Sequence, residues 1–179
     1  MKTTQILIAG FGGQGILFSG KFLAYKGLVE ELQVSWLPSY GPEMRGGTAN
    51  CNVILSDTPV GSPIITEPDV LIAMNTPSLE KYVNTVVSGG QIYVDSSLID
   101  AKVERDDVEV FYIPATHMAK EEGIATLANM IIVGHLLENH PELSFEGAAA
   151  VVDKLVPPKK EALKELNMKA ISLGKNYNK

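Results

Sequence analysis

A glycine-rich hexapeptide near the N-terminus has the composition and spacing of an anion-binding turn. Residues 10–15 are GFGGQG, which matches the pattern G-x-G-x-x-G between an apolar run and a segment of helical spacing. Glycines let such a turn close tightly, and a following helix presents unpaired N–H groups and a partial positive charge. We therefore expect a site for an anion or a carbonyl group. The residues with this predicted role are Gly10, Gly12, Gly13, Gln14 and Gly15.

A dinucleotide site would need one more feature, which is an acidic residue about 20 residues further on, at the end of the second strand. The second apolar run instead ends at Trp36-Leu37-Pro38, and Glu30 and Glu31 precede it. The missing carboxylate argues against NAD or FAD. Two other roles stay open: the glycines permit close packing of a strand and a helix, or the loop abuts a partner subunit or the edge of its ligand site.

A second segment, residues 40–47 with the sequence YGPEMRGG, places Glu43 and Arg45 on a loop stiffened by proline and glycine. In open α/β sheets, loops beyond the carboxyl ends of the strands line the ligand crevice. We expect this charged pair to bind a ligand or partner, or to form a local ion pair of little energy. The ligand- or partner-facing residues predicted here are Tyr40, Gly41, Glu43, Arg45, Gly46 and Gly47.

The remaining reactive side chains do not form a catalytic or metal site. His135 and His140 are five residues apart, so they do not share a helical face, and no further ligand accompanies them. Cys51 lies in an expected strand and is interpreted as a small buried side chain, and Ser96-Ser97 as a cap or turn. A single cysteine excludes a disulfide within the chain and a four-cysteine iron–sulfur cluster.

Hydrophobic periodicity predicts an α/β class, namely a three-layer Rossmann-like domain with a mainly parallel central sheet, a mixed sheet being the alternative, and a helical C-terminal third. Strands are expected at 5–9, 33–37, 48–56, 70–74, 91–95 and 108–113. Helices are expected at 16–30, 78–87, 115–122, 124–140 and 145–156.

The chain is expected to be a single domain, 1–179, that ends in an amphipathic helix over 159–179. Three side-chain roles follow from the spacing. Core contacts of the first helix are expected at Leu17, Ala24 and Leu28. An N-cap is expected at Ser144 for helix 145–156. The buried stripe of the last helix is expected at Leu163, Leu166, Ala170 and Leu173.

Composition excludes several classes of function. The chain has 179 residues, a formal net charge of −6 and 45% hydrophobic residues, which suits a soluble globular protein. It lacks the basic footprint of a nucleic-acid-binding protein, and its acidic balance disfavours anionic membranes. The apolar run at 6–9 is broken by glycines, so no signal peptide is expected, and the single cysteine suits a cytoplasmic location.

Taken together, the motifs resemble the gamma domain of 2-oxoacid:ferredoxin oxidoreductases. They are GFGGQG at 10–15, YGPEMRGG at 40–47, GSP at 61–63, PDVLIA at 68–73, and Asn129-Met130 with Gly134. They occur in family order between residue 5 and about residue 155. The form WLPSYGPEMR at 36–45 is more similar to the 2-oxoglutarate or 2-oxoisovalerate branch than to the pyruvate branch, and Pro68 departs from the alanine of many members.

The resemblance implies a subunit of an enzyme complex. Such a complex converts a 2-oxoacid, CoA and oxidised ferredoxin to acyl-CoA, CO2 and reduced ferredoxin. Alpha, beta and delta subunits hold thiamine diphosphate, Mg2+ and [4Fe-4S] clusters, and CoA is the cosubstrate. The gamma subunit packs against them, binds none of these groups by itself, is inactive alone, and could self-dimerise when isolated.

Two alternatives accompany this interpretation. One is the small subunit of indolepyruvate oxidoreductase, whose gamma-like part is similar. The other is a stand-alone Rossmann-type enzyme that binds a dinucleotide, against which the missing acidic residue argues. A pure scaffold whose loops touch no ligand is a further possibility.

Overall fold

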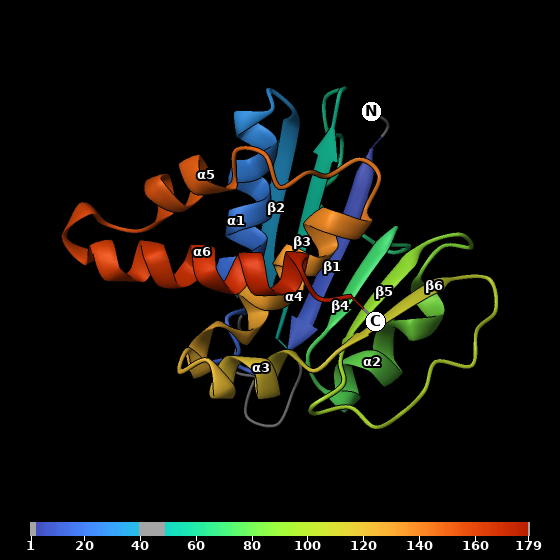
Figure 1. Ribbon diagram of the computed structural model, residues 1–179. Helices are drawn as coiled ribbons and strands as arrows, with labels where there is room; N and C mark the ends of the chain where they lie inside the picture. The colour runs from blue at the N-terminus through green and yellow to red at the C-terminus, as the bar shows by residue number, and fades with distance from the viewer. Residues whose placement is uncertain (1–2, 40–48, 179) are drawn as a thin grey trace.

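The apolar runs of the sequence pair into one six-stranded sheet (Figure 1). The computed structural model describes residues 3–39 and 49–178. The strands are β1 (Thr4–Gly10), β2 (Gln33–Ser39), β3 (Ala49–Ser56), β4 (Val70–Ala73), β5 (Gln91–Asp95) and β6 (Glu109–Ile113).

The order of the strands is β2-β3-β1-β4-β5-β6. Strands β1, β4, β5 and β6 pair in parallel, whereas β3 pairs antiparallel with both β1 and β2. Every strand of this sheet except β3 therefore runs in one direction, which confirms a mainly parallel, mixed sheet. The opening strand–helix–strand unit is split, because β3 lies between its two strands.

Helices cover both faces of the sheet (Figure 1). They are α1 (Ile16–Val29), α2 (Thr76–Tyr82), α3 (Ala115–Glu121), α4 (Ala128–Asn139), α5 (Ala148–Leu155) and α6 (Glu161–Lys175). Alternate residues of β1 face opposite layers: Ile6 and Ile8 pack with the core around α1 and α4, and Leu7 packs with the core around α2. The predicted three-layer architecture is confirmed.

The C-terminal layer is held by a close crossing of α4 and α6. A Cβ on Gly134 would overlap the carbonyl group of Ile171, and one on Gly174 would overlap the carbonyl group of Ile131. The two backbones therefore touch where both helices carry glycine. This explains why α4 is buried along nearly its whole length.

Three sequence-based side-chain predictions need correction. In α1 the predicted core contact Ala24 is buried and Leu17 packs against the core, but Leu28 is 56% exposed, because the helix turns Leu23 and Gly27 inward instead. Helix α5 begins at Ala148, and its N-cap is Gly147 in the left-handed conformation rather than Ser144, because Phe145 first forms a turn with the Ala148 amide.

The buried stripe of α6 also differs from the expected one. The helix turns Asn167, Ala170, Ile171 and Gly174 inward and leaves Leu163 and Leu166 exposed. Of the predicted stripe, Ala170 is buried and Leu173 packs against the core, whereas Leu163 and Leu166 lie outside the core because α6 approaches α4 through Gly174. The helix proper starts at Glu161, after a short 3-10 turn at Pro158–Lys160.

Candidate functional site

The two predicted loops leave the sheet at the same edge. Parallel strands bring their carboxyl ends together there, and the glycine loop follows β1. Gly10 pairs with Ala49, the first residue of β3, and Ser39, the last residue of β2, pairs with Asn50. The segment 40–48 therefore starts after Ser39, one strand away from Ala49, and ends at Ala49, which pairs with Gly10. Its predicted site residues from Tyr40 to Gly47 lie outside the described residues.

The glycine loop needs glycine for two different reasons. Gly13 and Gly15 have φ angles of +91° and +77°, in the left-handed region that side chains rarely adopt. Gly10 has an ordinary φ, but a Cβ there would lie 2.6 Å from Oε1 of Gln14. Gly15 is the N-cap of α1, and no side chain caps the helix, so the first backbone N–H groups of α1 are directed toward the loop.

Gln14 holds the glycine loop to the neighbouring strand. Its Oε1 accepts a hydrogen bond from the Phe11 amide at 2.6 Å, and its Nε2 donates to the carbonyl oxygen of Met74 at 2.9 Å. Met74 directly follows β4. The side chain predicted to face a ligand or partner is thus engaged within the chain, where it fixes the shape of the loop.

Replacing Gln14 by alanine is expected to lower the free energy of unfolding by about 1–3 kcal/mol, because two hydrogen bonds are lost from a half-buried group. Urea unfolding of the isolated chain measures this change. Gln33→Ala, at an exposed glutamine of β2, is the matched control and should change stability by less than about 0.5 kcal/mol. Equal effects of the two substitutions would contradict the role given to Gln14.

Asn129 contacts the glycine loop from α4, whereas Gln14 ties it to β4. Its Nδ2 donates to the carbonyl oxygen of Gly15 at 3.1 Å and to Oγ of Ser19 at 2.9 Å, so the first turn of α4 is tied to the first turn of α1. From the sequence, Asn129 was notable only as part of the resemblance, and its contact with Gly15 was not predicted. The available signal was a polar residue inside the apolar stretch from residue 124 to residue 137.

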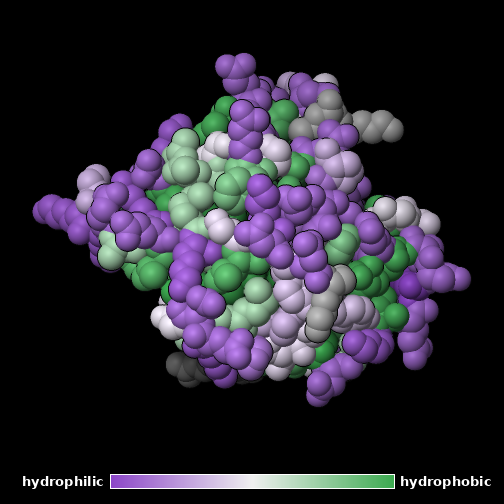
Figure 2. All heavy atoms as spheres, viewed as in Figure 1, coloured by the Kyte–Doolittle hydropathy of each residue, from purple (hydrophilic) through white to green (hydrophobic). Residues whose placement is uncertain are grey.

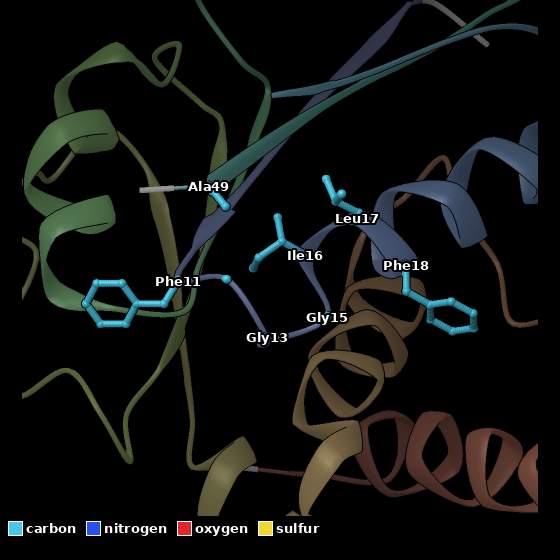
Figure 3. A pocket seen from close by; sticks show the side chains of 8 residues that line it. Phe11, Gly13, Gly15, Ile16, Leu17, Phe18 and Ala49 are labelled. Carbon is cyan, nitrogen blue, oxygen red and sulfur yellow. The ribbon is translucent and has the colours of Figure 1, made fainter. Parts of the chain in front are cut away.

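A hollow of about 270 Å³ lies in front of the loop (Figure 3). Phe11 and Phe18 point away from each other at its two ends, and Ile16 lies between them. The lining residues are Phe11, Gly12, Gly13, Gly15, Ile16, Leu17, Phe18 and Ala49. None of them has an ionisable side chain, so the hollow offers apolar surface and backbone N–H groups, which suit a carbonyl or an anion.

The geometry disfavours a dinucleotide at this hollow. The strand next to β1 is the antiparallel β3, so the carboxyl end of β2 lies one strand further from the glycine loop than in a dinucleotide-binding fold. Strand β2 also ends in Leu37-Pro38-Ser39, without a carboxylate.

Exposed apolar side chains accompany the hollow at the same edge. Phe11, after β1, is 44% exposed, and Leu98, after β5, is 45% exposed. Between them the buried carboxylate of Asp95 accepts hydrogen bonds from the amide of Ser97 at 3.1 Å and from the hydroxyl of Thr116 at 2.6 Å. The turn role predicted for Ser97 is confirmed, since its Oγ also accepts from the His117 amide.

The histidine and cysteine side chains have structural surroundings. His135 packs edge-on against Tyr93 and Tyr177, its Nδ1 lies 3.0 Å from the carbonyl oxygen of Gly174, and burial lowers the pKa of its ring. Burial raises the pKa of the Cys51 thiol to about 12, which keeps it protonated at neutral pH. The predicted buried role of Cys51 is confirmed.

The described residues contain neither a metal-binding cluster nor a membrane-spanning helix. No group of three or more histidine, cysteine, aspartate or glutamate side chains between 3–39 and 49–178 is arranged to hold a metal ion. Among the helices in that part of the chain, none has the length and apolar character needed to cross a membrane.

The sheet order and the glycine loop at its carboxyl edge define a Rossmann-like α/β domain. Residues 5–177 match the family described as pyruvate ferredoxin/flavodoxin oxidoreductase. The chain belongs to this family, which confirms the resemblance inferred from the motifs.

Curated relatives include subunits of two kinds of oxidoreductase. The ketoisovalerate oxidoreductase subunit VorA of Methanothermobacter thermautotrophicus is 37% identical over 177 residues, which is 97% of this chain and 36% of VorA. The 2-oxoglutarate synthase subunit KorC of Methanothermobacter marburgensis is 35% identical over 178 residues, or 96% of this chain and 94% of KorC. The chain thus spans about a third of VorA and nearly all of KorC.

Solved structures agree with these relatives. The gamma subunit of a keto/oxoacid ferredoxin oxidoreductase from Geobacter sulfurreducens superposes with a TM-score of 0.81 at 31% identity, over 96% of this chain and 95% of that one. The 2-oxoglutarate:ferredoxin oxidoreductase of Magnetococcus marinus, solved with 2-oxoglutarate, coenzyme A and succinyl-CoA bound, superposes with a TM-score of 0.86 at 26% identity, over 98% of this chain and 31% of that one.

Proposed function

We propose that this chain is the gamma subunit of a 2-oxoacid:ferredoxin oxidoreductase complex, as one gamma domain. The complex forms an acyl-CoA and CO2 from a 2-oxoacid and CoA, and ferredoxin takes up the electrons. The observation that carries the proposal is the hollow at the glycine loop, whose lining residues include no group that could transfer a proton or an electron. Its surface suits docking and positioning, so the chemistry is assigned to partner subunits.

The division of labour follows from this assignment. Alpha, beta and delta subunits hold thiamine diphosphate, Mg2+ and the [4Fe-4S] clusters, and ferredoxin docks on the complex. The near-complete match to KorC and to the Geobacter gamma subunit supports the gamma-subunit assignment. VorA, in which the matching part is 36% of the length, supports a close association with further protein in the related complexes.

The glycine-loop edge is assigned to the catalytic subunits and the path of CoA. Backbone N–H groups at the start of α1 and the exposed Phe11 suit a thioester carbonyl or a phosphate on one side and apolar protein on the other. The Magnetococcus enzyme, which binds CoA and succinyl-CoA, shares this fold.

The substrate is assigned to the 2-oxoisovalerate or 2-oxoglutarate class, because VorA and KorC are 37% and 35% identical. The indolepyruvate oxidoreductase subunit IorB of Archaeoglobus fulgidus is more distant, at 26% identity. A cytoplasmic location and self-dimerisation of the isolated chain stay predictions.

Substitution of the charged pair in segment 40–47 tests the proposal. Glu43→Gln and Arg45→Met are each expected to lower turnover or assembly of the complex at least about tenfold, or roughly 1.4 kcal/mol, because the segment leads directly into Ala49, which pairs with Gly10 of the glycine loop. The measurements are 2-oxoacid-dependent ferredoxin reduction and recovery of the partner subunits on the tagged chain.

The unfolding midpoint of the isolated variants is expected to stay at the wild-type value, which separates a loss of assembly or turnover from a loss of the fold. Glu104→Gln, at an exposed glutamate between β5 and β6, is the control and should leave turnover unchanged. Normal assembly and turnover in both loop variants would show that the glycine-loop edge does not contact the catalytic subunits or the path of CoA. Turnover of an oxoacid by the isolated chain would remove the proposed division of labour.

A further inference from the structure

A second hollow lies beside the glycine loop, between the first turns of α1 and α4 and the helical hairpin formed by α5 and α6. We call it the hairpin groove. Its volume is about 250 Å³. Its apolar lining residues are Phe18, Leu127, Leu155, Val156, Pro157 and Leu163. Figure 1 shows that α5 and the start of α6 project from the body of the molecule, and Figure 2 shows apolar surface there bordered by hydrophilic side chains.

Two buried carboxamides also line the hairpin groove. Asn129 and Asn167 are each 3% exposed. Nδ2 of Asn167 donates to the carbonyl oxygen of Leu163 at 2.7 Å, and Nδ2 of Asn129 donates to that of Gly15. Carbonyl oxygens only accept, so these contacts determine which side of each carboxamide carries the NH2 group.

The oxygens of the two carboxamides are therefore acceptors without a donor among the described residues. Oδ1 of Asn129 and Oδ1 of Asn167 are buried and have no hydrogen-bond partner in the part of the chain that the structure describes. Buried acceptors without a donor are uncommon and destabilising. Two of them at one groove are acceptors available to the N–H or O–H donors of a bound chain, and their burial means that such a chain would reach them only with a small opening of the hairpin.

Exposed lysines without an acidic partner among the described residues lie on the hairpin, next to the acidic side chains Asp153 and Glu161, which pair with Lys164, and the exposed Glu165. The exposed side chains Lys154, Lys159 and Lys160 make no ion pair with any described residue, and Lys160 lines the groove. Lys164, in contrast, is paired with Asp153 at 2.9 Å. The chain as a whole has a net charge of −6, so this local excess of unpaired lysines favours an acidic partner.

We propose that the hairpin groove binds a segment of a partner subunit that carries one apolar anchor side chain, flanked by acidic residues, and donates backbone N–H groups to Asn129 and Asn167. The inference rests on the proposed function, because it assumes a subunit of a complex. The volume is small for a cofactor and suits a single anchor residue, as at the centres of protein interfaces. Leu163, 40% exposed, and Leu166, 37% exposed, extend the apolar contact area beyond the groove.

Charge reversal and an apolar-to-acid substitution test the inference in the assembled complex. Lys159→Glu/Lys160→Glu and Leu163→Asp are each expected to weaken association with the partner subunits at least about tenfold. Their unfolding midpoints should stay at the wild-type value, because all three side chains are exposed. Leu28→Asp, at an exposed leucine of α1 outside the groove, is the matched control and should assemble normally.

Carbodiimide cross-linking of the wild-type complex gives an independent readout. Amide bonds between Lys159 or Lys160 and a carboxylate of a partner subunit, located by mass spectrometry, are expected. Wild-type assembly of both groove variants would overturn the inference, and so would cross-links from these lysines only to a second copy of this chain.

The outcomes separate this inference from the proposed function. If the groove variants assemble normally while Glu43→Gln and Arg45→Met lose turnover, the role of the hairpin groove is refuted and the gamma-subunit assignment stands. If the wild-type chain recovers no partner subunit, both the groove proposal and the gamma-subunit assignment are refuted. Loss of self-association alone in Leu163→Asp would assign the groove to a second copy and overturn the inference.

Discussion

Replacing Gly174 by alanine is expected to lower the free energy of unfolding by about 3 kcal/mol or more. The new Cβ would overlap the carbonyl group of Ile131 and lie 2.8 Å from the His135 amide nitrogen, and both are backbone atoms that cannot rotate away. Helices α4 and α6 would have to separate, which would expose part of α4, the most buried helix. Urea unfolding of the isolated chain, followed by circular dichroism, measures the loss.

Gly134→Ala addresses the same crossing from the other helix and should have a similar effect, since its Cβ would overlap the carbonyl group of Ile171. The loss of unfolding free energy in the double variant should be smaller than the sum of the losses in the two single variants, because one separation of the helices relieves both overlaps. Gly61→Ala is the control, as nothing lies within 4 Å of the added Cβ. Stability of Gly174→Ala equal to that of the control would show that the helices do not cross this closely.

Gly15→Ala is expected to damage both the glycine loop and the function of the complex. The residue has a φ of +77°, and a Cβ would lie 2.5 Å from Nδ2 of Asn129. Left-handed backbone costs a residue with a side chain about 1–2 kcal/mol, and displacement of Asn129 adds to that. We expect a loss of about 2–3 kcal/mol in unfolding free energy and a fall of at least about tenfold in turnover of the complex.

Gly13→Ala provides a matched control for this effect. Its φ of +91° imposes the same kind of strain, but nothing lies within 4 Å of the added Cβ. The difference between the two variants therefore reports the contact with Asn129. Gly15→Ala/Asn129→Ala should recover part of the loss, because the overlap is removed. Indistinguishable stabilities of Gly13→Ala and Gly15→Ala would show that Asn129 does not hold the loop.

Local features of this protein were determined by the sequence itself. Central strands buried on both faces need continuous apolar runs, so the strand expected at 91–95 is β5 (Gln91–Asp95). Left-handed turns need glycine, so the glycine loop could be located from GFGGQG at 10–15. The family followed from motifs that occur together and in order, which a single motif would not have shown.

The tertiary structure alone decided which distant segments meet. Strand β3 inserts antiparallel between β1 and β2, because pairing across the sheet depends on partners that local periodicity does not encode. Asn129 contacts Gly15 across 114 positions of sequence. Leu163 and Leu166 face outward because α6 packs through Gly174, and a side-chain pattern cannot show where two backbones touch.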